Sequence, residues 1–454
     1  MKKRTFLKTS SSLIAGSLLT PMISCKETPE NTQAMIRKNW AGNLQYSAKQ
    51  YYEPNTVEEI QDLIKQADKV RLLGTRHCFN TIADSPDTQI SLKNFDKIIE
   101  LDEAAQQVTI GAGIKYGQLC PYLHEKGFAI HNLASLPHIS VAGACATATH
   151  GSGVGNGNLG TGVAAVEFVN GKGELVTLSR AKDGDRFLGA VVNLGGLGAI
   201  TKVTLDIEPT YQMRQDVYQY LPMEALADHF DEIMSSGYSV SLFTDYQTDK
   251  VNQVWIKRKV EKGVEQSAEP EFFGAQLATR DIHPILAISA ENCTPQMGVV
   301  GPWYERLPHF RMDFTPSSGT ELQAEYFVPR ENAVAAIQAI QQMGSRLKQL
   351  LMISEIRTIK ADELWMSTAY RRESVAIHFT LEQDWAALQL LLPDIEKALE
   401  PFGARPHWGK MFTLAPSTLQ SRYERLPDFK DLLKENDPDE KFSNPFLQKN
   451  LYQG

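Results

Sequence analysis

The chain has 454 residues, of which 42% are hydrophobic and 22% are charged, and its formal net charge is −8 at pH 7. This length and composition are those of a globular protein with two or three domains. The acidic balance and the lack of a long basic run argue against nucleic-acid binding, and no apolar run is long enough to span a bilayer.

The first 25 residues have the layout of an export signal. Basic residues at positions 2–4 precede an apolar stretch over 13–19, and residues 3–8 resemble a twin-arginine motif with Lys3 in place of the first arginine. Met22-Ile23-Ser24-Cys25 resembles a lipoprotein cleavage box. These features predict export to the cell envelope or periplasm, a lipid on Cys25 that attaches the protein to a membrane, and a polar tether over 26–36. A plain signal peptide with an incidental cysteine is the alternative.

The cysteines give no sign of a disulfide framework or a metal site. They form no CxxC pair and show no metal-ligand spacing. The five are Cys25, Cys78, Cys120, Cys145 and Cys293.

Short strands and helices alternate over 37–209. Thr56 and Glu59 form a capping box, and the apolar residues that follow repeat at helical spacing, which predicts a helix over 57–68. Two strand-like runs on either side of Gly171-Lys172-Gly173 predict a hairpin of 163–169 with 175–178. The other elements expected here are strands over 70–73, 108–111 and 200–207, and a helix over 116–126 that ends at Gly127.

From about residue 210, strand-like runs alternate with longer helical runs, which indicates a sheet covered on one side by helices. Strands are expected over 211–220, 238–245, 252–259, 321–328, 351–358 and 374–381. Helices are expected over 222–235, 330–348, 384–400 and 426–434. Residues 262–318 have little periodicity, and we assign no element there.

The stretch 132–157 consists largely of small residues from Val141 onward. Small side chains let the backbone approach a flat or charged ligand, and free backbone N–H groups can bind a pyrophosphate. The stretch is therefore either a cofactor loop or a small-residue turn packed beneath a helix. Its glycine spacing is not the strand–GxGxxG–helix pattern, so a Rossmann site is not favoured.

Two predicted strands carry polar residues on one face. Glu355 and Arg357 are two apart, as are His378 and Thr380, so each pair shares a strand face. Neighbouring strands would bring an acid, a guanidinium, an imidazole and a hydroxyl together. The alternative is a solvated outer face with a surface ion pair, which contributes little.

Six motifs run in order from about residue 37 to 450 and together identify a family. They are Gly74-Thr75-Arg76-His77-Cys78-Phe79-Asn80, Ser135-Leu136-Pro137-His138-Ile139-Ser140-Val141-Ala142-Gly143, Thr149-His150-Gly151-Ser152-Gly153, Ser354-Glu355-Ile356-Arg357-Thr358, His378-Phe379-Thr380 and His407-Trp408-Gly409-Lys410. In these motifs the chain resembles the vanillyl-alcohol-oxidase-type flavoproteins, and within them the sugar-alcohol and aldonolactone oxidases, with the alditol oxidases nearest.

The resemblance implies an α+β fold of two domains that binds FAD. The FAD-binding domain would span 37–209, the substrate domain with its antiparallel sheet 210–420, and residues 421–454 would return to the FAD domain. His77 matches the histidine that bonds covalently to the flavin in many relatives; a noncovalent contact is the alternative. Cys78 and Cys145 are expected to be packing residues. The implied cofactor-binding residues are Gly74, Thr75, Arg76, His77, Cys78, Ser135, His138, Ser140, Gly143, Thr149, His150, Gly151, Gly153 and Ile200.

The resemblance also implies the site chemistry. The reaction would oxidise the terminal primary alcohol of a polyol such as xylitol or sorbitol to the aldehyde, with hydride transfer to flavin N5. Substrate would be bound by Ser135, Glu355, Arg357, His378, Thr380 and Lys410. His378 is the candidate base, Lys410 could share that task, and Glu355 and Arg357 complete the catalytic set.

The sequence does not determine the electron acceptor. O₂ would give H₂O₂, and Ala134, beside the flavin in relatives, affects oxygen access there. The alternatives are an aldonolactone or sugar oxidase that uses a quinone or cytochrome carrier, and a carbohydrate-binding envelope lipoprotein without catalysis.

Overall fold

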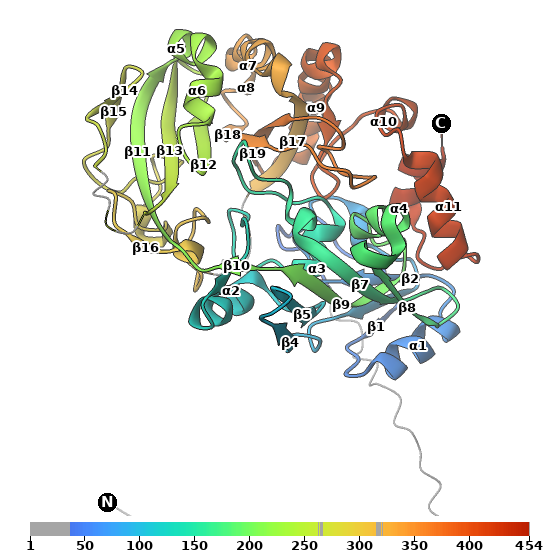
Figure 1. Ribbon diagram of the computed structural model, residues 1–454. Coiled ribbons are helices and arrows are strands. Elements are labelled where there is room, and N and C mark those ends of the chain that lie inside the picture. Colours follow the sequence, from blue (N-terminus) through green and yellow to red (C-terminus); the bar gives the residue numbers. More distant parts are fainter. Residues whose placement is uncertain (1–36, 262, 264–266, 315–318, 320, 454) are drawn as a thin grey trace, which may run out of the picture.

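The computed structural model describes residues 37–453 except 262, 264–266, 315–318 and 320. Two bodies lie against each other, one built on a smaller sheet and one on a large sheet capped by helices (Figure 1). This is the expected mixed architecture of helices and antiparallel sheet. The predicted export signal and Cys25 lie outside the described residues.

The smaller body contains a five-stranded antiparallel sheet in the order β4-β5-β9-β7-β8. Its strands are β4 (Ile98–Asp102), β5 (Gln107–Gly111), β7 (Val163–Val169), β8 (Leu175–Ser179) and β9 (Ala199–Asp206). A parallel sheet is formed by β1 (Gln50–Tyr52), β3 (Thr88–Ser91) and β2 (Val70–Leu73), and β6 (Phe128–Ala129) pairs with β10 (Glu208–Pro209). The helices are α1 (Val57–Gln66), α2 (Tyr116–Glu125), α3 (Val141–Ala146) and α4 (Arg180–Val191).

The predicted elements of this body are confirmed, with small shifts at their ends. Thr56 Oγ1 accepts a hydrogen bond from Glu59 N at 3.2 Å, so the capping residue begins α1 where expected. The helix ends at Gln66 rather than 68, because Ala67 is extended, with φ −78° and ψ 142°. Gly127 follows α2 with φ +84°, a conformation that glycine adopts without strain.

The large sheet has the order β14-β15-β11-β13-β12-β18-β19-β17-β20, and β16 also pairs with β11. Its strands are β11 (Gln212–Pro222), β12 (Ser239–Thr244), β13 (Lys250–Lys259), β14 (Glu271–Phe272), β15 (Ala275–Leu277), β16 (Gly301–Pro302), β17 (Glu321–Pro329), β18 (Leu351–Ile359), β19 (Ser374–Glu382) and β20 (Arg405–Pro406). Figure 1 shows α5 (Met223–Asp228), α6 (Phe230–Met234), α7 (Ala333–Gln341), α8 (Gly344–Leu347) and α9 (Trp385–Leu399) gathered on one side of it. The predicted sheet covered on one side by helices is confirmed.

Two helices predicted as continuous are each divided into two. The helix expected over 222–235 breaks at His229, whose φ of −126° and ψ of 27° are not helical. The helix expected over 330–348 breaks before Gly344, where a Cβ atom would lie 2.3 Å from the carbonyl oxygen of Tyr246. Helix α7 ends at Gln341, and the missing side chain of Gly344 lets the start of α8 pack closely against Tyr246.

The two faces of the large sheet differ in character. Ile356, Ile377 and Phe379 are fully buried in one apolar cluster with residues of the covering helices. Glu355 and His378 are paired across β18 and β19 and, by strand alternation, lie on the opposite face. That face points toward the smaller body.

Residues 278–314 cross this polar face as a largely irregular segment, which explains why no periodicity was found there. The end of the chain, with α10 (Pro416–Gln420), α11 (Leu426–Asn436) and α12 (Pro445–Leu447), packs into the apolar core of the smaller body. Val70 N donates to Lys441 O at 2.7 Å, so the end of the chain is hydrogen-bonded to β2.

Candidate active site

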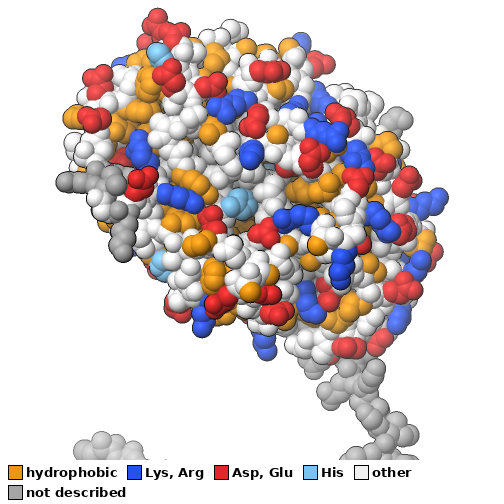
Figure 2. Space-filling model, viewed as in Figure 1, with side chains coloured by type: hydrophobic (Ala, Val, Ile, Leu, Met, Phe, Trp, Pro, Cys, Tyr) orange, Lys and Arg blue, Asp and Glu red, His pale blue; other side chains and the backbone are white. Residues whose placement is uncertain are grey.

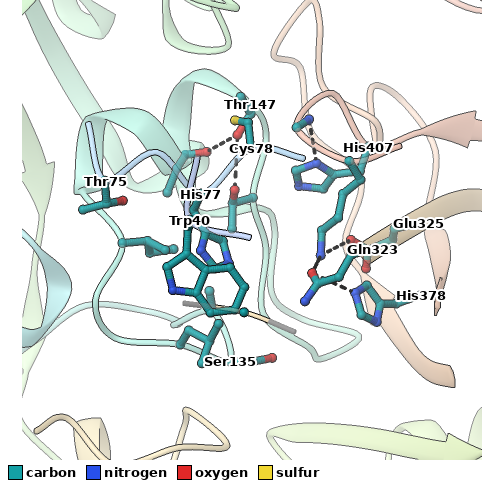
Figure 3. Close-up of a pocket in the computed structure, with 18 of the residues that line it drawn as sticks. Trp40, Thr75, His77, Cys78, Ser135, Thr147, Gln323, Glu325, His378 and His407 are labelled. Atoms are coloured by element: carbon teal, nitrogen blue, oxygen red, sulfur yellow. Dashed lines mark hydrogen bonds and ion pairs between the residues drawn. The ribbon is translucent and has the colours of Figure 1, made fainter. Parts of the chain in front are cut away.

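A cavity of about 490 Å³ lies between the two bodies. Loops of the smaller body line one side, and the polar face of β17, β18 and β19 lines the other. In Figure 3, Trp40 and His77 stand on one side and Gln323, Glu325 and His378 on the other. The volume is in the range of small-molecule and cofactor sites.

The loops of the smaller body approach each other through small residues. A Cβ atom at Gly74 would lie 2.3 Å from Ser140 Oγ, and one at Gly143 would lie 2.8 Å from the same atom. Ser140 N donates to Thr75 Oγ1 at 3.2 Å. The lack of side chains at both glycines therefore lets the loop after β2 pack directly against the start of α3.

The loop after β2 is also bonded to the turn that carries Lys410. Asn80 Nδ2 donates to the carbonyl oxygens of Trp408 at 2.8 Å and Lys410 at 2.7 Å. Phe79 N donates to Gly409 O at 2.8 Å. Two motifs more than 300 residues apart in the chain thus form one rigid edge of the cavity.

His77 is half-buried at the centre of an aromatic group. Its ring centroid lies 4.4 Å from that of Trp40 and 5.0 Å from that of His138. Burial, with smaller contributions from His138 and Lys410, lowers the pKa of His77 well below its usual value. Its Nδ1 has no hydrogen-bond partner in the described part of the chain. His77 is therefore a neutral imidazole with an unsatisfied nitrogen.

The polar face of the sheet is organised around Glu325, a residue the sequence analysis did not identify. Glu325 Oε1 accepts from Arg357 Nη2 at 2.6 Å and lies 3.1 Å from His150 Nε2, and Lys410 Nζ lies 3.8 Å from Oε2. Burial opposes the negative charge, but His150, Arg357 and Lys410 hold the pKa of Glu325 well below its usual value. The carboxylate therefore holds two cationic side chains, those of Arg357 and Lys410, at one wall of the cavity.

Gln323 links the two candidate bases. Its Oε1 accepts from Lys410 Nζ and lies 3.2 Å from His378 Nε2 (Figure 3). Burial, followed by Lys410, lowers the pKa of His378 well below its usual value, and burial lowers the pKa of Lys410 to about 8. At neutral pH this arrangement pairs a neutral imidazole with an ammonium group.

Glu355 and Arg357 lie beside these residues on the same face. Arg357 Nε is 3.5 Å from Glu355 Oε1, and Arg357 Nη1 donates to Ser135 Oγ at 3.5 Å. Burial alone would raise the pKa of Glu355, but Arg357 and His309 hold it well below its usual value. Both side chains are only 6% exposed, so the alternative of a solvated surface ion pair is wrong.

Most residues predicted for the site line the cavity. Those that do are Gly74, Thr75, Arg76, His77, Cys78, Ala134, Ser135, Ser140, Gly143, Thr149, His150, Glu355, Arg357, His378, Thr380 and Lys410. His138, Gly151, Gly153 and Ile200 are not among the lining residues. His138 lies directly behind His77, and Gly151 packs under the cavity loop, where a Cβ atom would lie 2.4 Å from Leu133 O.

The cavity is also lined by four residues that were not predicted from the sequence, namely Trp40, His309, Gln323 and Glu325. Gln323 and Glu325 are two apart in a strand that was predicted, so the same argument from strand faces could have found them. His309 lies in the segment without periodicity, and no sequence signal marks it.

The residues on the loop side fit FAD. Small residues leave room for a large flat group, and Nδ1 of His77, which lines the cavity, is buried without a hydrogen-bond partner in the part of the chain the structure describes. Buried polar atoms in folded proteins are rarely left unpaired, so a ligand with polar atoms is expected here. The four described cysteines are free thiols, and the described residues contain no cluster of side chains that could hold a metal ion.

Comparisons with known proteins indicate an FAD-dependent oxidoreductase. A family model described as D-arabinono-1,4-lactone oxidase matches residues 203–450, and one described as FAD binding domain matches residues 48–179. The chain is 43% identical over 413 residues to alditol oxidase of Streptomyces sp. (strain IKD472 / FERM P-14339), covering 90% of this chain and 97% of that protein. It is 27% identical over 433 residues to L-gulono-1,4-lactone dehydrogenase of Mycobacterium tuberculosis, covering 92% and 99%. Cholesterol oxidase from B. sterolicum has the same fold, with a TM-score of 0.71 at 15% identity over 91% of this chain and 96% of that one.

Proposed function

The chain belongs to the alditol oxidase family of FAD-dependent oxidoreductases, which is of the vanillyl-alcohol oxidase type, and on this premise we propose that it oxidises the terminal primary alcohol of an alditol to the aldehyde. Its cofactor is FAD, and it acts on CH–OH donors. Xylitol and sorbitol are examples of such an alditol.

One observation carries this proposal. Glu355, Arg357, His378, Thr380 and Lys410 line one wall of a single cavity, opposite the loop that carries His77. A chain of hydroxyl groups needs several acceptors and donors in a row, because each hydroxyl both donates and accepts. The wall offers both kinds, and it faces the loops that fit the flavin.

When bound, the flavin accepts the hydride that leaves the carbinol carbon. The side chains of the wall would hold the substrate so that its terminal carbon faces the loop side of the cavity. His378 is neutral and would take the hydroxyl proton, while Gln323 fixes the orientation of its ring. Lys410 would stabilise negative charge on the substrate oxygen, because its ammonium group is held beside Gln323 and Glu325.

His77 would hold FAD covalently through a bond between an imidazole nitrogen and the flavin 8α carbon. This bond would replace one C–H bond of the 8-methyl group, and the two electrons released would pass to the flavin ring and from there to O₂. The neutral ring and unpartnered Nδ1 of His77 support this role, because only a nitrogen lone pair can form the bond. Trp40 and His138 would restrain the ring by packing against it.

The visible spectrum of the purified protein tests the proposal. We expect a flavin spectrum, yellow colour that stays in the pellet after acid precipitation, and bleaching when xylitol is added without oxygen. Parallel titrations with sorbitol and with L-gulono-1,4-lactone compare alditol with lactone. A flavin that xylitol and sorbitol do not bleach would overturn the assignment of alditol as substrate.

We propose O₂ as the electron acceptor, with H₂O₂ as the product. The small Ala134 lines the cavity and leaves space for oxygen near the loop side. An oxygen electrode measures this directly, and an enzyme that xylitol reduces but air reoxidises only slowly would point to a quinone or cytochrome carrier.

We also propose that the protein is exported to the cell envelope and anchored by a lipid on Cys25. The basic residues, apolar run and cysteine at its start support this proposal. Labelling with a fatty-acid analogue should mark the wild type and leave Cys25→Ser unlabelled. No label on the wild type would remove the anchor. No helix among the described residues has the length and apolar character needed to cross a membrane.

A further inference from the structure

A buried lysine lies behind the polar wall of the cavity. Lys257, on β13, is 1% exposed, and its Nζ donates to Leu307 O at 2.6 Å and to Pro308 O at 2.9 Å. The third acceptor is His309 Nδ1, at 3.2 Å. An ammonium group has three protons, so these contacts use all of its donors.

The contact with Lys257 decides which nitrogen of His309 carries a proton. Because Nδ1 accepts from the ammonium, the proton of the neutral ring is on Nε2. His309 Nε2 donates to Glu355 Oε1 at 2.7 Å. Burial, followed by Lys257, lowers the pKa of His309 to about 4, which agrees with a neutral ring.

The carboxylate of Glu355 is oriented by these contacts. Within the described residues, both His309 and Arg357 approach Oε1, at 2.7 Å and 3.5 Å, and Glu355 lines the cavity. Oε2 is therefore available to a ligand. A carboxylate whose partner can only donate stays ionised, and its available oxygen can only accept a hydrogen bond.

We propose that Lys257 and His309 are positioning residues that determine the affinity for polyols, by holding Glu355 as an ionised acceptor for one substrate hydroxyl remote from the reacting carbon. The inference rests on the proposed function, since it assigns a partner for that hydroxyl. Lys257 acts through His309 and touches neither substrate nor cofactor.

Packing alone does not account for this chain of contacts. Burying a lysine is costly, and an apolar residue could fill its volume. The segment it contacts has another brace, since Thr294 Oγ1 also donates to Pro308 O, at 2.8 Å. In addition, His309 N donates to Ser135 O at 3.2 Å, so the same segment supports a second residue of the cavity wall.

The test compares flavin-loaded variants in anaerobic xylitol reduction and steady-state kinetics at pH 6, below the Lys257 pKa of about 7, so that the lysine is an ammonium group. Lys257→Met and His309→Phe should each raise KM for xylitol roughly tenfold or more, because a hydrogen bond to a charged group is weakened or lost. The kcat at saturation should stay within about threefold, since the groups at the reacting carbon are unchanged. His309→Gln should restore most of the affinity, because its amide can donate to Glu355 and accept from Lys257.

Three comparisons separate this role from a purely structural one. In the His309→Phe background, Lys257→Met should add little, because Lys257 acts through His309. Thr294→Val removes hydrogen bonds to the carbonyl oxygens of Pro308 and His309 and so loosens the same segment, but it keeps the side-chain contacts of Lys257 with His309 and of His309 with Glu355, and it should leave KM near the wild-type value. A short diol such as 1,2-propanediol lacks the remote hydroxyls, so its KM should change little in any variant.

Additive effects of the two substitutions, a KM rise of similar size in Thr294→Val, or an equal rise for the short diol would overturn the inference. If Lys257→Met fails to fold with flavin, equal KM values for His309→Gln and His309→Phe would overturn it instead. Failure of the proposed function is distinguishable, because the wild type itself would then not be reduced by xylitol.

Discussion

Glu325 and Arg357 form a buried ion pair that joins β17 to β18 across the intervening strand β19, with 2.6 Å between Oε1 and Nη2. Glu325 is 1% exposed and Arg357 is 6% exposed, so water screens neither charge well. The pair is one reason why the polar face of the sheet can be buried between two bodies. Acidic and basic side chains on the outer surface are, by contrast, interspersed and solvated on the face shown in Figure 2.

Glu325→Gln keeps the shape of the side chain but removes its charge, which leaves Arg357 buried without its closest counter-ion. We expect a loss of about 3–5 kcal/mol in unfolding free energy, because an unpaired buried charge is costly. Urea unfolding followed by fluorescence measures the difference. Asp206→Asn, which breaks the exposed pair of Asp206 with Arg180, is the matched control and should cost about 1 kcal/mol or less. Equal losses in the two variants would contradict the central role of Glu325.

Lys410 should set the alkaline limit of activity. Burial lowers the pKa of Lys410 to about 8, so its positive charge is present below that pH and is lost above it. Since the ammonium stabilises the reacting oxygen, kcat/KM for xylitol should fall about tenfold per pH unit above pH 8. Lys410→Arg should retain activity at high pH if any turnover remains, because the guanidinium keeps its charge. An unchanged limb at pH 8 in Lys410→Arg would assign it to another group.

Lys410→Met should lower kcat by roughly 100-fold or more, because the substitution removes a group at the reacting oxygen. The flavin should remain bound, because the loop residues that would hold FAD are unchanged. Stopped-flow flavin reduction separates this chemical step from reoxidation. The flavin content per chain, read from the absorbance ratio, is the control. A variant with near-normal reduction rates would exclude Lys410 from the reaction.

His77→Ala should abolish the covalent attachment of FAD. The colour should move from the acid pellet to the supernatant, because the only proposed nucleophile toward the flavin is gone. His138→Ala is the matched control, since His138 packs against His77 at 5.0 Å between ring centroids and has no bond to the flavin in this scheme. Colour retained in the His77→Ala pellet would place the link elsewhere.

Lys257 should make stability depend on pH in a defined window. Burial lowers its pKa from 10.5 to about 7 in the folded protein. Between these values the unfolded chain binds the additional proton, so the lysine's contribution to unfolding free energy rises with pH from about 7 to 10.5. Lys257→Met removes this slope. The difference in urea midpoint between wild type and variant, measured at several pH values, should therefore shift in favour of the wild type as pH rises; a constant difference would contradict the lowered pKa.

Much of the fold could be predicted because its elements carry local patterns. Thr56 and Glu59 mark the start of α1, and the alternation in β18 and β19 places Glu355, Arg357 and His378 on the correct face. The close contact of Gly344 with the carbonyl of Tyr246 could not be predicted, because Tyr246 is distant in the chain. Whether the polar face of β18 and β19 is buried or solvated also depends on distant parts of the chain, so the sequence pattern left both alternatives open.

The strands, their two faces and the family motifs could be recognised from local sequence, because side-chain alternation and short motifs are properties of neighbouring residues. The folded chain alone shows which strands lie side by side, and it brings Glu325 to Arg357 across β19. It also decided that His309, in a segment without periodicity, meets Lys257 and Glu355. These contacts join residues from separate strands and loops, and their energies depend on burial and charge that arise only when the two bodies pack together.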